Sequence, residues 1–203
     1  PTPGLLLADF DDATFARVLE TNLWATFWCM QAARPHFLKR RKGSIINFAS
    51  GSGTRGQETQ GAYAAAKEGI RGLSRVAARE WGPDGIRVNV ICPFANSPGM
   101  VAWSKLDPIA YAAQLEQIPL RRVGDCEEDV GRVAVFLASD DSAYVTAQTM
   151  WVDGGSGTRA RVCIQPSWVR RARGRARRGR DDRRASGRRA SAASARSRRS
   201  GDR

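Results

Sequence analysis

Histidine is almost absent from this chain, and its cysteines form no pattern. The 203 residues contain one histidine, His36, and four cysteines at positions 29, 92, 126 and 163, with no Cys-x-x-Cys pair. Zinc sites need clustered Cys and His ligands, and disulfide scaffolds need a dense cysteine framework, so both classes are disfavoured. We therefore expect no metal site and a reducing, cytoplasmic setting.

Long apolar runs are also missing. The most apolar segment, LWATFWCMQAA at residues 23–33, is short and contains a glutamine, whereas a membrane-spanning helix needs roughly 20 apolar residues. The N-terminus has no basic segment followed by an apolar one, as a secretory signal would have, and the first methionine is Met30. We expect no membrane partner, and a sequence that starts within a longer protein.

Lysine is absent from the C-terminal segment, where arginine is abundant. Residues 158–203 hold 17 Arg, no Lys and 3 Asp, a net of +14, whereas residues 1–157 hold 16 basic and 17 acidic groups, a net of −1. We predict a globular domain over 1–157 and a disordered basic tail over 158–203, since a segment of Arg, Ala, Gly and Ser cannot form a core. Its composition is that of GC-rich codons read out of frame or past a lost stop. The alternative is a non-enzymatic role, in which the tail binds nucleic acid without sequence specificity.

Strand-like runs alternate with helical patterns over residues 1–157, which is typical of an α/β protein with a parallel sheet. Strands are expected at 44–49, 86–92 and 148–152, and helices from Asp11 or Asp12 towards Pro35, over 62–81, near 109–117, and from Asp125 or Glu127 to Ser139. The rest of 94–120 is expected to be an irregular loop, because Pro98, Pro108 and Pro119 interrupt it.

Tyr63 and Lys67 stand four residues apart near the start of the predicted helix 62–81. That spacing places a phenol and an ammonium on one helix face. A nearby cation favours the phenolate, so we expect Lys67 to lower the pKa of Tyr63 towards the working pH, as a general acid for carbonyl reduction requires. The alternative is a helix that happens to carry an aromatic residue and an extended lysine.

Ser50 follows the predicted strand 44–49, and ligands of open α/β sheets bind at the carboxyl ends of strands. The strand end and the following helix can therefore bring the Ser50 hydroxyl beside Tyr63. Ser50 can instead simply cap the strand end, and its neighbour Ser52 competes for the role. Asn22 lies in the helix before that strand, where it can also serve only to bond the helix backbone.

The motifs TNLWATF, GSIINFAS, YAAAK, GIRVNVICP and VDGG follow one another in this order. In that order and spacing, roughly residues 5–157 resemble the short-chain dehydrogenase/reductase family, in its compact branch. The resemblance implies the C-terminal half of a Rossmann-type doubly wound parallel sheet. It also implies NAD or NADP as cofactor, reversible hydride transfer between a small-molecule alcohol and a ketone, and assembly as a homodimer or homotetramer.

The resemblance also implies roles for particular residues. Tyr63 would exchange the substrate proton, Lys67 would lower its pKa and hold the nicotinamide ribose, Ser50 would hydrogen-bond the substrate oxygen, and Asn22 would anchor a relay water. Tyr63 and Lys67 would thus contact the cofactor as well as the substrate. The loop 94–120 would cover the substrate with Trp103, Leu106, Tyr111 and Leu115. For other residues we expect structural roles. These are Asn89, a turn at Asp153–Gly155, and helix packing by Trp24, Phe27 and Trp28.

Two departures from the family pattern matter. Pro93 is normally followed by Gly and then by a Thr that contacts the cofactor, but here the sequence reads PFANSPGM, so we expect Pro93 together with Asn96 or Ser97 to make that contact. The family's Gly-rich turn that binds the pyrophosphate is not found, and GSGTRG at 51–56 lies on the substrate side. We expect this chain alone neither to bind the dinucleotide tightly nor to turn over, and the strand 44–49 to be an exposed sheet edge.

Overall fold

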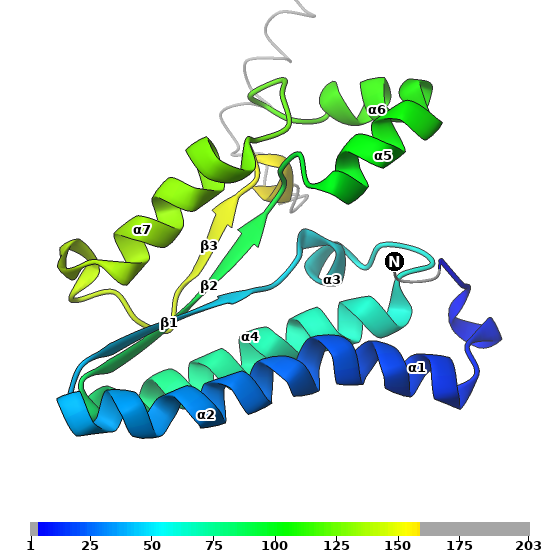
Figure 1. Ribbon diagram of the computed structural model, residues 1–203. Coiled ribbons are helices and arrows are strands. Elements are labelled where there is room, and N and C mark those ends of the chain that lie inside the picture. The colour runs from blue at the N-terminus through cyan, green and yellow to red at the C-terminus, as the bar shows by residue number, and fades with distance from the viewer. Residues whose placement is uncertain (1–3, 159–203) are drawn as a thin grey trace, which may run out of the picture. The chain divides into compact units, whose positions relative to one another are not determined.

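The structure is a computed structural model that describes residues 4–158. The predicted tail, apart from its first residue, lies outside the described residues. The described part contains a parallel sheet in the order β1-β2-β3, formed by β1 (Gly43–Phe48), β2 (Ile86–Pro93) and β3 (Thr149–Val152), as Figure 1 shows. The three predicted strands are therefore confirmed to within a residue or two, and so is their parallel arrangement.

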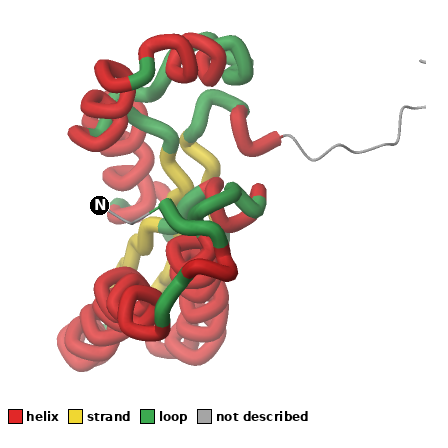
Figure 2. The backbone as a smooth tube through the Cα atoms, turned by 90° about the vertical axis from the view of Figure 1, so that its right-hand side faces the viewer, coloured by secondary structure: helices red, strands yellow, loops and turns green. Residues whose placement is uncertain are grey.

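Helices cover both faces of this sheet (Figures 1 and 2). On one face lie α2 (Ala25–Arg40) and the long α4 (Gly61–Trp81), preceded by α1 (Asp12–Leu19); on the other lies α7 (Arg132–Ala138). Apolar side chains from the strands fill both interfaces: Ile45 and Val88 pack with Met30 on the α2 side, and Ile91 packs with Leu137 on the α7 side. A layered α/β fold follows from these two cores.

The first helical segment is longer than expected. Asp11 caps α1 through its side chain, which accepts a hydrogen bond from the Thr14 amide at 2.8 Å, and a π-helical turn, Glu20–Trp24, links α1 to α2. The helix does not end near Pro35 but continues to Arg40. Pro35 has no N–H to donate to the carbonyl four residues earlier, which is that of Gln31. Gln31 is exposed, so water can bond this carbonyl and the helix can continue.

Residues 94–120 contain two helices, α5 (Pro98–Leu106) and α6 (Pro108–Leu115), where the sequence predicted a mostly irregular loop. The prolines begin these helices instead of interrupting them, because each stands at the first helical position, where its missing N–H costs nothing. The residue before each proline is the cap: Ser97 accepts from the Met100 amide, and Asp107 accepts from the Ala110 amide.

The remaining elements are short. They are α3 (Gly51–Arg55), the π-helical turn Cys126–Gly131 that leads into α7, and the 3-10 turns Leu7–Asp9, Gly82–Asp84, Asp140–Ser142 and Ser156–Thr158. Asp125 caps the π-helical turn, so the predicted start of that helical segment is confirmed. No helix in residues 4–158 is long and apolar enough to cross a bilayer.

Two sequence expectations about the sheet are met within the described residues. β1 pairs with β2 alone, and Phe48 at its end is 45% exposed, so β1 is an open edge there. Asn89 is fully buried in β2, where its amide donates to the Val145 carbonyl at 2.8 Å and its oxygen accepts from the Gln148 amide at 3.1 Å. Asn89 therefore fixes the segment that leads into β3, a structural role.

Candidate active site

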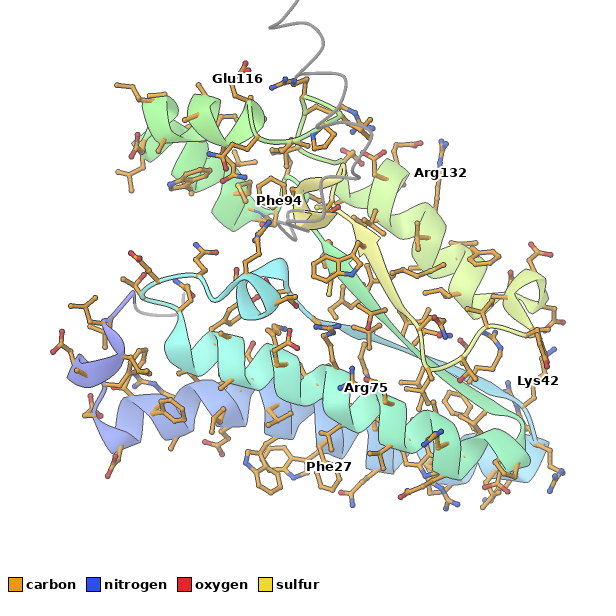
Figure 3. All side chains as sticks on the ribbon, turned by 180° about the vertical axis from the view of Figure 1, so that it is seen from behind. Phe27, Lys42, Arg75, Phe94, Glu116 and Arg132 are labelled. Atoms are coloured by element: carbon orange, nitrogen blue, oxygen red, sulfur yellow. The ribbon has the colours of Figure 1, made fainter. Side chains whose placement is uncertain are left out.

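The carboxyl ends of the three strands meet at one edge of the sheet, because the strands are parallel. Ser50 follows β1, Phe94 follows β2, and Asp153 follows β3. Figure 3 shows Phe94 at this edge, close to the helices α5 and α6. Residues from three different connections, with the polar side chains of Ser50 and Asp153 among them, are thus gathered where open α/β sheets bind their ligands.

A cavity of about 720 Å³ lies at this edge, within the range of small-molecule sites. Its polar lining includes the hydroxyl groups of Ser50 and Tyr63. Its apolar lining includes Pro93, Met100 and Trp103. The cavity therefore combines two adjacent hydroxyl groups with walls suited to an apolar ligand.

Ser50 has two roles in the structure. Its Oγ accepts a hydrogen bond from the Ser52 amide at 3.2 Å, so Ser50 caps the start of α3, whereas the alternative considered from the sequence was a cap of the strand end. Its side chain also lies near that of Tyr63 and lowers the pKa of the phenol. The Ser52 hydroxyl, by contrast, donates to Gln57 at 2.8 Å. The structure thus joins Ser50, and not Ser52, to Tyr63.

Lys67 lies one helical turn after Tyr63 on α4. Its Nζ is 5.4 Å from the centroid of the Tyr63 ring and donates a hydrogen bond to the Phe48 carbonyl at 3.1 Å. The ammonium thus lies over the ring face, where the electrostatic attraction is to the π-system. The pair shares one helix face, as its spacing predicted.

The expected direction of the Tyr63 pKa is wrong. Burial raises the pKa of the Tyr63 phenol, and the Ser50 side chain offsets part of that rise. Burial also lowers the pKa of the Lys67 ammonium. The sequence argument considered the cation and left out the desolvation of both groups, which is the larger effect here.

Cys92 is a neighbour that the sequence argument did not assign to the site. It is the penultimate residue of β2, is 1% exposed, and contributes to the cavity wall. Burial raises the pKa of its thiol to about 11. A neutral, buried thiol is a poor nucleophile, so Cys92 is a packing residue of the site. The sequence feature that could have indicated its place in the site is its position directly before Pro93, at the end of a predicted strand.

The other predicted site residues lie differently. Pro93 lines the cavity, whereas Asn22 and Asn96 are not part of its lining. Asn22 lies in the π-helical turn, where its amide donates to the Val18 carbonyl at 3.0 Å, the local bonding considered as its alternative role. Asn96 is exposed, and its backbone amide donates to Gly124 at 2.8 Å. Ser97 lines the cavity while it caps α5.

The helices α5 and α6 supply one wall of the cavity. Trp103 lines it and packs edge-on against Tyr111, with ring centroids 5.6 Å apart. Leu106, expected to cover the substrate, is 85% exposed at the end of α5. Leu106 is the last residue of α5 and does not line the cavity, so the expectation that it covers the substrate is not met by this structure.

No group of three or more His, Cys, Asp or Glu side chains within residues 4–158 is placed to hold a metal ion.

Comparisons with known proteins show the family to which the chain belongs. Residues 4–157 match a family model described as "Enoyl-(Acyl carrier protein) reductase". A solved structure of an oxidoreductase of the short-chain dehydrogenase/reductase family from Burkholderia thailandensis has a TM-score of 0.73 and 30% identity, over 81% of this chain and 65% of that one. The chain belongs to the short-chain dehydrogenase/reductase family.

Two further members of the short-chain dehydrogenase/reductase family are informative. A 12alpha-hydroxysteroid dehydrogenase from Clostridium sp. is 50% identical over 139 residues, which are 68% of this chain and 53% of that protein. A solved structure from Agrobacterium tumefaciens with bound NADP is 33% identical, with a TM-score of 0.73, over 78% of this chain and 65% of that one. The chain therefore spans about half the length of the first relative and about two thirds of the second.

Proposed function

We propose that this protein catalyses reversible, NAD(P)-dependent hydride transfer between an alcohol and a ketone. One observation carries the proposal: the side chains of Ser50 and Tyr63 line one cavity at the strand ends, with Lys67 one turn away, in a chain of this family. A general acid, a second hydroxyl that can orient the substrate, and a cation are the groups that carbonyl reduction needs.

Tyr63 exchanges the proton with the substrate oxygen in this proposal. Because burial raises its pKa, Tyr63 is protonated at neutral pH, which suits a donor of a proton to a ketone. Ser50 bonds the same oxygen and orients it, since the two hydroxyl groups are neighbours. Lys67 stabilises the phenolate that remains after transfer. Asn22, in the π-helical turn, anchors a water of the proton relay.

We propose NAD or NADP as the cofactor, which supplies or accepts the hydride when bound. The relative with bound NADP supports this. The donor set also fits the ribose and nicotinamide end of a dinucleotide, because Tyr63 and Lys67 carry a hydroxyl group and an ammonium group at the strand-end edge. Pro93 lines the same cavity, with Asn96 on the connection that follows it.

The 203-residue chain by itself, we propose, neither holds the dinucleotide tightly nor turns over. The support is the absence from its sequence of a Gly-rich pyrophosphate turn of the TGxxxGxG type. Saturable enhancement of NADPH fluorescence by the purified chain at micromolar concentration is the result that contradicts this.

We propose that two or four copies assemble through the outer face of α2 and α4. Trp24, at the end of the π-helical turn before α2, is 49% exposed, Trp28 on α2 is 50% exposed, and Val76 on α4 is 52% exposed. Figure 3 shows Phe27 on the same outer side of the helices. Exposed apolar patches of this kind mark interaction sites. A reducing, cytoplasmic location is also proposed, and the free thiols of the three described cysteines agree with it.

The experiment begins with the gene. An in-frame Gly-rich turn encoded upstream of codon 1 supports the proposal, and the protein that includes it is then assayed for NADH and NADPH oxidation with a panel of ketones. We expect Ser50→Ala to lower kcat/KM by about 100-fold and Ser52→Ala to leave it nearly unchanged. Equal losses in both variants, or a larger loss in Ser52→Ala, contradict the assignment of Ser50.

A further inference from the structure

Among residues 4–158, a single arginine contributes to the wall of the cavity that holds Ser50 and Tyr63. Arg55 ends the short helix α3, which begins directly after Ser50. Its guanidinium Nη1 donates to the Ser156 hydroxyl at a long 3.4 Å, and no carboxylate among residues 4–158 forms an ion pair with it. A cation at the wall of a ligand cavity, with one weak neutral partner, retains donors for an anion.

The Arg55 side chain folds back towards the start of its own helix. A Cβ placed on Gly51 would lie 3.1 Å from Arg55 Nη2 and 3.3 Å from the ring of Trp151. Glycine at position 51 therefore leaves room for the guanidinium to lie against the backbone beside Ser50. The guanidinium therefore lies close to Gly51, the residue next to Ser50, whose hydroxyl bonds the substrate oxygen in the proposed function.

Within the described part of the chain, Asp153 is the acidic side chain that lines the cavity, and both of its oxygens accept hydrogen bonds. Asp153 accepts from the backbone amides of Gly155 and Gly157 and from the Ser156 hydroxyl. Ser156 thus stands between Asp153 and Arg55, and the two charges do not meet directly. The other polar side chains of the wall are uncharged: they are hydroxyl groups, such as that of Ser97, and the amides of Gln57 and Gln114. The guanidinium is therefore the group of this wall suited to bind a negative charge.

We propose that Arg55 binds a carboxylate of the substrate, so that the substrate is an oxo acid or hydroxy acid whose acid group lies a few bonds from the reacting carbon. The identity of the reacting carbon rests on the proposed function. The preference for a carboxylate does not, because it can be measured by binding to the chain without any hydride transfer.

The probe pair is 4-oxo-4-phenylbutanoate and its uncharged methyl ester. Both present a ketone and an aromatic ring to the apolar wall formed by Met100 and Trp103. Binding to the 203-residue chain is followed by tryptophan fluorescence, because Trp103 and Trp151 line the cavity. We expect the carboxylate to bind about tenfold more tightly than the ester, with an advantage that shrinks as salt is added.

The variants separate Arg55 from a general effect of positive charge. Arg55→Gln is expected to lose the preference for the carboxylate while it keeps its affinity for the ester, which shows that the cavity is intact. Arg75→Gln, which changes an exposed arginine on α4, is expected to keep the preference. Equal affinities in the wild-type chain, a preference that survives in Arg55→Gln, or no binding of either probe up to its solubility limit overturns the proposal.

Discussion

We predict that Arg71 holds together α3, which Ser50 caps, and α4, which carries Tyr63. It lies on α4, two helical turns after Tyr63, and its Nη1 donates to Thr54 on α3 at 2.8 Å and to the two oxygens of Glu68 at 2.9 and 2.8 Å. Its guanidinium also lies 5.8 Å from the centroid of the Trp151 ring on β3. One side chain therefore connects α3, α4 and β3.

The cost of Arg71→Met can be worked out from these contacts. Losing hydrogen bonds between charged groups costs about 1.5–3 kcal/mol, but the buried Nε of Arg71 has no partner, so its removal returns about 1 kcal/mol. Glu68 is 39% exposed and can be rehydrated, and its bond to Thr54 at 2.8 Å remains. We expect a net loss of roughly 0.5–2 kcal/mol in the free energy of unfolding.

Urea unfolding followed by tryptophan fluorescence measures this loss. Arg75→Met is the matched control, because Arg75 lies one turn further along the same helix and is exposed (Figure 3). We expect that control to remain within about 0.5 kcal/mol of the wild-type chain. Equal unfolding midpoints for the two variants would refute the view that Arg71 joins the helices.

Three other predictions follow from burial and charge. Iodoacetamide near pH 8 is expected to alkylate exposed Cys126 and to spare Cys92, whose pKa is raised to about 11; mass spectrometry that finds equal labelling contradicts this. Lys42 lowers the pKa of Asp140, so their pair stabilises the folded state above about pH 4 and loses this effect in acid. Lys42→Met should therefore lower the urea midpoint near pH 7 and leave it unchanged near pH 2, and equal shifts at both values argue against the pair. Leu137→Ala is expected to cost about 2–5 kcal/mol in calorimetry, because Leu137 is fully buried, and a loss below about 1 kcal/mol contradicts its place in the core.

The strands and the long helix were predictable because local patterns determine them. β2 is a short apolar run that ends at Pro93, and α4 has apolar residues at helical spacing before a Gly-Pro stop. The juxtaposition of Ser50 and Tyr63 was predictable too, since a residue at a strand end and one in the next helix meet at the same edge of a parallel sheet.

The misread segments share one cause, which is proline. Pro98 and Pro108 were interpreted as interruptions, although each follows a residue that caps helices, Ser97 or Asp107. Pro35 was interpreted as a helix end, although the carbonyl that it leaves unpaired is on an exposed turn. In each case the effect of proline depends on where it stands in the helix and on solvent access, which the residue type alone does not give.

The long-range parts of the site were beyond the sequence argument. Arg71 contacts Thr54 across 17 positions, and Arg55 contacts Ser156 across 101 positions. No periodicity records such pairs. The raised pKa of Tyr63 was missed for a related reason, because desolvation depends on neighbours from several elements.

The most direct test of the central claim is the rate of ketone reduction after removal of one hydroxyl group. In the protein assayed with its upstream in-frame segment, Tyr63→Phe is compared with Tyr144→Phe, which removes a hydroxyl group from a fully exposed tyrosine. The account predicts a loss of about 100-fold or more in NAD(P)H oxidation for Tyr63→Phe and none for Tyr144→Phe. A Tyr63→Phe enzyme that retains the wild-type rate would contradict it.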